Sequence, residues 1–83
     1  MSRNQITVSD QVEALNAALA KNAKGRKAGD KLAKHPHVQA FVAKRQFAKY
    51  LDAGGDPTNW QAFLDWLVKN LPAIIAMIVT LFA

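Results

Sequence analysis

The chain has 83 residues, no cysteine and two histidines, so it can form no disulfide bond and hardly a zinc site, and its stability must come from helix packing, oligomerisation or lipid. Its net charge of +5 is unevenly spread. Residues 21–49 hold nine cations and one acid, which makes that segment +8, whereas two bases and five acids make the remainder −3. The opening residues lack the apolar segment of a secretory signal, so we expect no signal peptide.

The first predicted helix covers about residues 8–22. Thr7 followed by Asp10 is typical of a helix start, and Ser9 is an alternative cap. Large apolar residues then recur at spacings of four, three and four, at Val8, Val12, Leu15 and Leu19. These positions form one narrow apolar stripe, which suits a single neighbouring helix rather than a thick core.

The next segment, residues 21–30 (KNAKGRKAGD), has two glycines, four cations and no large apolar side chain. This composition predicts a solvated linker. A second helix is predicted over about residues 36–53, because Pro36 suits a first helical turn and Gly54 with Gly55 ends the pattern.

A third helix is predicted over about residues 57–82, with Asp56 and Pro57 at its start. Apolar residues alternate spacings of three and four along it, which predicts a helix-packing seam. The seam consists of Leu64, Leu67, Leu71, Ile74, Ile78 and Leu81. After Pro72 the helix is apolar on every side, and the proline predicts a kink or break there.

These elements predict an all-α fold of three helices with little independent globular core. Residues 1–55 would form a basic helical body with a Gly- and Lys-rich linker near 21–30, and residues 56–83 an amphipathic-to-apolar membrane anchor. As one helix, residues 60–83 would rise about 36 Å, enough to cross a hydrocarbon layer of about 30 Å. The alternatives are burial of the tail between subunits and an interfacial or re-entrant helix.

The cations of the middle segment are the predicted contact with an anionic surface. They are Lys21, Lys24, Arg26, Lys27, Lys31, Lys34, Lys44, Arg45 and Lys49. Lipid headgroups would satisfy them, and so would nucleic-acid phosphates, with Phe41, Phe47 and Tyr50 stacking on bases. A merely solvated helix face is the third interpretation. Trp60 and Trp66 are expected either at a lipid interface or as core aromatics.

Catalytic and metal chemistry find little support in the sequence. His35 and His37 flank Pro36 but lack a third ligand, so we expect no metal site. No phosphate-binding loop, nucleophile elbow or Ser/His/Asp arrangement is visible, so we expect no enzyme, no cofactor and no small-molecule substrate.

The resulting hypothesis is a small membrane-associated structural or assembly protein. Its C-terminal helix would anchor it in a lipid bilayer, its basic part would lie on the cytoplasmic or particle-interior side, and it would assemble with copies of itself or other subunits. The layout, rather than any motif, resembles small phage-encoded membrane proteins, including internal-membrane components of virions. A holin-like or bacteriocin-like pore former and a soluble nucleic-acid-binding helical oligomer are the alternatives.

Overall fold

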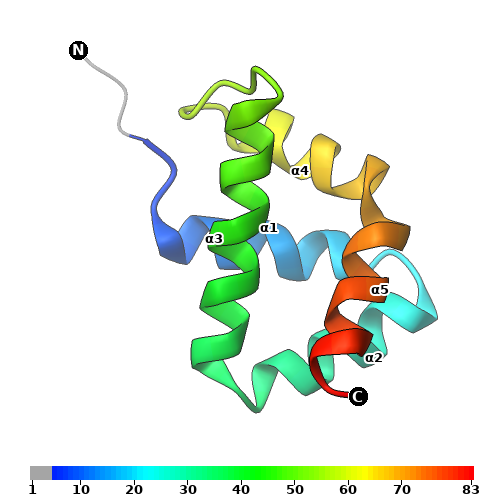
Figure 1. The fold of residues 1–83 in the computed structure, drawn as a ribbon. Helices are drawn as coiled ribbons and strands as arrows, with labels where there is room; N and C mark the ends of the chain where they lie inside the picture. The colour runs from blue at the N-terminus through cyan, green and yellow to red at the C-terminus, as the bar shows by residue number, and fades with distance from the viewer. Residues whose placement is uncertain (1–4) are drawn as a thin grey trace.

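The computed structural model describes residues 5–83, which contain five helices and no strand (Figure 1). The helices are α1 (Val8–Leu19), α2 (Ala23–Ala33), α3 (Pro36–Asp52), α4 (Trp60–Lys69) and α5 (Leu71–Leu81). The all-α prediction is confirmed. The prediction of three helices with little core is wrong, because one helix was missed, another is broken in two, and all five pack around a common interior.

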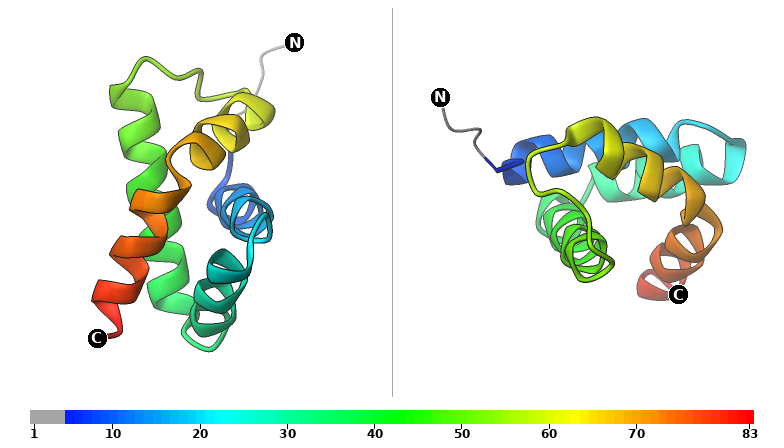
Figure 2. Two further views of the ribbon diagram at one scale, coloured as in Figure 1. Left: turned by 90° about the vertical axis from the view of Figure 1, so that its right-hand side faces the viewer. Right: turned by 90° about the horizontal axis from the view of Figure 1, so that it is seen from above.

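Helix α1 begins at a capped end and lies at the centre of the fold. The Thr7 hydroxyl oxygen accepts a hydrogen bond from the Asp10 amide at 3.1 Å, as an N-cap should. Leu15 and Leu19 are completely or almost completely buried, and α2, α3 and α4 all pack against α1 (Figures 1 and 2). The buried face of α1 is therefore wider than the predicted stripe and also includes Ala14 and Ala18, whereas Val8 of the stripe is exposed.

The segment predicted as a linker is largely helix α2. The Asn22 side-chain oxygen caps this helix by accepting a hydrogen bond from the Gly25 amide at 2.7 Å. Gly25 lies directly against the backbone of Leu19, where it has no side chain to keep the two helices apart. Ala28 and Leu32 are buried on the same face. The helix forms because small residues let it approach α1 closely.

Helix α3 begins with Pro36 in its first turn and ends before Gly54, which has a left-handed φ of 91°. The turn that follows is tied back to the helix, since the Tyr50 hydroxyl donates to the Asp56 carbonyl oxygen at 2.8 Å. Tyr50 belongs to a cluster of packed aromatic rings formed by Phe47, Tyr50, Phe63 and Trp66. This cluster joins α3 to α4.

The predicted third helix is two helices, α4 and α5, which meet at Asn70 and are bent by 76° relative to each other. The Asn70 side-chain amide donates to the Trp66 carbonyl at 2.7 Å and so closes the end of α4. Pro72 lies in the first turn of α5, where its missing N–H breaks no helical hydrogen bond. The break therefore falls two residues before the predicted position.

The interior of the fold contains much of the apolar tail. Leu71, Ile74 and Ile78 are almost completely buried in one cluster with Leu15 and Leu32. The chain thus supplies its own cover for one side of α5. No single helix in residues 5–83 is long and apolar enough to cross a membrane, although the bent α4–α5 pair reaches that length and composition together.

Candidate functional site

The outer side of α5 is an exposed surface without charge. Helix α5 has no ionisable residue, and Val79 is 60% exposed on it. Pro72 and Ala76 are exposed beside Val79, and Ile75 is half-buried. The hydroxyl of Thr80 donates to the Ala76 carbonyl of its own helix at 2.9 Å. The surface therefore offers apolar contact and little hydrogen bonding.

A row of lysines on α2 borders this surface. Lys24, Lys27 and Lys31 are spaced by three and four residues, so they lie on one face of the helix, the face toward α5. Between the two helices lies a half-open hollow of about 260 Å³, here called the α2–α5 groove. Figure 2, left, looks onto this side of the molecule, with both helices in view, and α2 and α5 are in contact. The groove is lined by Lys24, Lys27, Ala28, Lys31, Ile75, Ile78 and Val79.

The lysines of the groove are available for an external anion. Within residues 5–83, neither Lys24 nor Lys27 has a carboxylate at salt-bridge distance. The ammonium group of Lys31 lies 5.8 Å from the centre of the Phe82 ring, a weak cation–π contact. Positive charge beside an uncovered apolar helix face is the arrangement that peripheral membrane proteins use at anionic bilayers.

The remaining predicted cations lie elsewhere on the molecule. Lys44 and Arg45 are on the outer face of α3, where they line a separate hollow with His37 and Phe41. Phe41 is 53% exposed. Lys21 and Lys34 are exposed, Lys49 lies beside a small hollow between α3 and α5, and Arg26 is turned toward α1. The structure thus distributes the nine cations over several parts of the surface.

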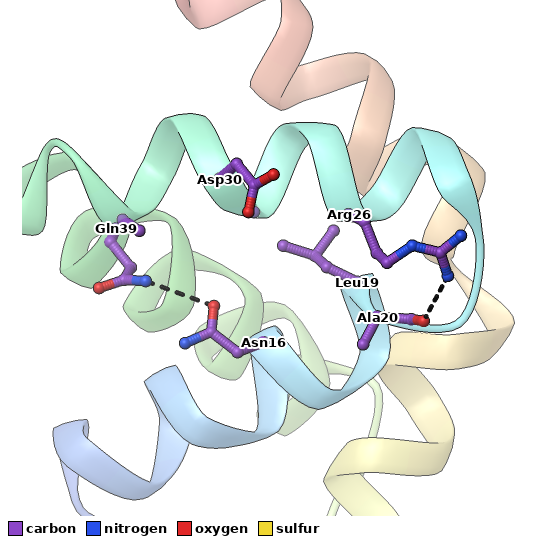
Figure 3. Close-up of a pocket in the computed structure, with 8 residues that line it drawn as sticks. Asn16, Leu19, Ala20, Arg26, Asp30 and Gln39 are labelled. Carbon is purple, nitrogen blue, oxygen red and sulfur yellow. Dashed lines mark hydrogen bonds between the residues drawn. The ribbon is translucent and has the colours of Figure 1, made fainter.

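A further hollow of about 250 Å³ lies between α1, α2 and α3 and is lined by polar and apolar residues (Figure 3). Three of its polar side chains are hydrogen-bonded within the protein. The Arg26 guanidinium donates to the Ala20 carbonyl at 3.2 Å, near the end of α1, and the Gln39 amide donates to the Asn16 side-chain oxygen at 3.3 Å. These contacts join the three helices, so we assign the hollow a structural role.

The two tryptophans lie in contact with the rest of the fold. The Trp60 indole N–H donates to the Asp10 carbonyl at 3.0 Å, and the Trp66 ring packs against Tyr50 and Phe63. Both rings are half-buried.

The predicted packing seam is turned mainly toward the chain's own core. Leu67, Leu71, Ile74 and Ile78 are buried, and Leu64 is half-buried. Leu81 is 46% exposed.

The two histidines lie in different environments. His35 packs against the Phe82 ring, with 5.1 Å between ring centres, whereas His37 lies on the outer face of α3. Among the described residues no group of three or more histidine, aspartate or glutamate side chains could hold a metal ion.

Sequence reasoning identified the lysines but missed the groove. The spacing of Lys24, Lys27 and Lys31 is helical, and it would have placed them on one face had residues 21–30 been predicted as helix. Comparison of the chain with protein families, with curated proteins and with solved structures finds no match.

Proposed function

We propose that this protein is a peripheral membrane component that binds the surface of bilayers containing anionic lipids. The observation that carries the proposal is the juxtaposition of Lys24, Lys27 and Lys31 with the uncharged, exposed side of α5. The lysines would meet lipid phosphates while Val79 and its neighbours enter the headgroup region.

The fold favours contact with one leaflet while the five helices stay together. Burial of Ile74 and Ile78 ties α5 to the rest of the chain, and drawing that helix across a bilayer would uncover the core residues packed against it. An intact globule can instead present the outer side of α5 to lipid. Each lysine near an anionic surface contributes about 1 kcal/mol, so three contribute about 3 kcal/mol.

Cosedimentation with lipid vesicles tests the electrostatic half of this proposal. The triple variant Lys24→Gln, Lys27→Gln, Lys31→Gln should bind phosphatidylcholine–phosphatidylglycerol vesicles about a hundredfold more weakly than the unchanged protein. The matched control is Lys44→Gln, Arg45→Gln, Lys49→Gln, which removes the same net charge from α3. Equal losses in the two variants would show that net charge alone drives binding and would overturn the proposed face.

The apolar half is tested on the same vesicles with a pair of single substitutions. Val79→Ser should weaken binding by about tenfold, because burying a valine side chain stabilises by about 1.5 kcal/mol. Val68→Ser on α4 changes another exposed valine that lies outside the groove, and it should have little effect. Binding that is insensitive to Val79→Ser would contradict insertion of α5.

Nucleic-acid binding is a second candidate, favoured by the exposed Phe41 ring beside Lys44 and Arg45. Phe41 is well placed to stack on a base, whereas Phe47 and Tyr50 are buried in the aromatic cluster. The α3 triple variant that serves as the vesicle control also tests this candidate. It should lose affinity for single-stranded RNA at low salt if α3 binds nucleic acid, and the α2 variant should not.

A further inference from the structure

We propose that the α2–α5 groove binds the hydrocarbon chain of a single fatty acid, with the carboxylate held by the lysines at its edge. The inference rests on the proposed function, since it uses the same face of the molecule, and it names the ligand that this face would take up from a membrane. In this groove apolar walls from two helices and three lysine side chains meet in one hollow.

The walls of the groove suit a hydrocarbon chain. Ala28 and Ile78 are almost completely buried residues at its base, and Ile75 and Val79 are more exposed residues of α5 along it. None of these side chains has a polar atom, so an alkyl chain lying there would displace water without breaking protein hydrogen bonds.

The groove is small. Its 260 Å³ lies below the range of about 300–1,000 Å³ that is usual for sites holding drug-sized molecules. A methylene group has roughly the volume of a water molecule, about 30 Å³, so the groove accommodates a chain of about nine carbons. A medium-chain fatty acid suits this size, and a larger hollow of about 680 Å³ that shares Lys24, Ile75 and Val79 adjoins the groove on the same face.

Charge determines which head group accompanies that chain. Of the residues that line the groove, Lys24, Lys27 and Lys31 have polar side chains, and no acidic residue lines it. The three lysines follow the edge of α2, so a carboxylate can reach at least one of them wherever along the groove the chain ends. A neutral head group would gain no comparable contact.

Titration of the isotope-labelled full chain with decanoate, below its micelle concentration and without vesicles, tests the inference by NMR. We expect saturable shifts centred on the amides of Ala28, Lys31, Ile75 and Val79. Decanol, with the same chain and no charge, should bind about tenfold more weakly, since a hydrogen bond to a charged group contributes about 1.5 kcal/mol. Acetate, which has no chain, should leave the groove unchanged. Absent, unsaturable or evenly spread shifts with decanoate would overturn the proposal.

Two substitutions on α5 locate the binding. Val79→Phe should fill the groove and reduce decanoate affinity at least about tenfold. Leu81→Phe adds the same ring at an exposed position outside the groove, and it should bind decanoate as the unchanged protein does. Equal decanoate affinities of the two variants would show that decanoate does not bind in the α2–α5 groove. Circular dichroism of both variants verifies that each is folded.

The vesicle and decanoate experiments can fail separately. If the unchanged protein binds vesicles and not decanoate, the groove proposal is wrong and the proposed function stands. If it binds decanoate and not vesicles, the proposed function is wrong.

Discussion

Tyr50 shows how one side chain ties a turn to a helix. Its hydroxyl donates to the Asp56 carbonyl at 2.8 Å, and its ring packs within the aromatic cluster. Replacing Tyr50 with Phe keeps the ring and removes this hydrogen bond, so we expect a loss of about 1 kcal/mol in the free energy of unfolding at neutral pH. Urea unfolding followed by circular dichroism measures it. Unchanged stability would mean that the hydrogen bond does not hold the turn.

The same residue predicts a pH dependence. Burial raises the pKa of Tyr50 above its ordinary value of 10.0, because the charged form is poorly solvated in the fold. Above that value the unfolded chain releases the proton while the folded chain retains it, so stability should fall as pH rises. The Tyr50→Phe variant has no ionisable group at this position, so its stability lacks this pH-dependent contribution. The stability difference between the two proteins should therefore shrink above pH 10.0, and a difference that stays constant would contradict the raised pKa.

At the scale of elements, the starts of α1 and α3 were readable from the sequence and α2 was not. The predicted start at Asp56 and Pro57 is wrong, because α4 begins at Trp60 with Asn59 as its cap. Thr7 and Pro36 are in the roles that their residue types indicate. Helix α2 has two glycines, each costing about 1 kcal/mol relative to alanine in a helix interior, and one large apolar residue, Leu32. Close packing on α1 stabilises this helix, and helix propensity alone does not predict that packing.

The two glycines of α2 should respond to alanine in opposite directions. A Cβ atom at Gly25 would collide with the carbonyl oxygen of Leu19, whereas at Gly29 the nearest contact would be the Leu19 Cδ1 atom at an ordinary 3.7 Å. We expect Gly25→Ala to destabilise by about 1–3 kcal/mol through overpacking, and Gly29→Ala to stabilise by up to about 1 kcal/mol through helix propensity. Urea unfolding compares the two, and effects of one sign would contradict the close crossing of α1 and α2.

At the scale of the whole molecule, the sequence identified the apolar residues of the tail but not the helices that bury them. The predicted seam assigned an inward position to Ile74 and Ile78, and both are buried, yet the cover is the chain's own α1 and α2. The spacing of apolar residues shows which face of a helix is hidden and does not reveal what hides it. The groove was missed for the same reason, since it exists where α5 meets a helix that local pattern did not predict.

Stability measurements can decide how firmly α5 belongs to the core. Ile74 is 1% exposed and Val79 60%, although both lie on this helix. Ile74→Val removes one buried methylene and should cost about 0.5–1.5 kcal/mol, whereas Val79→Ala should change the free energy of unfolding by less than about 0.5 kcal/mol. Urea unfolding in the absence of lipid measures both on a single cooperative transition. If α5 were detached from the other helices in water, the two substitutions would have equally small effects, and the buried tail described above would require lipid or a partner to form.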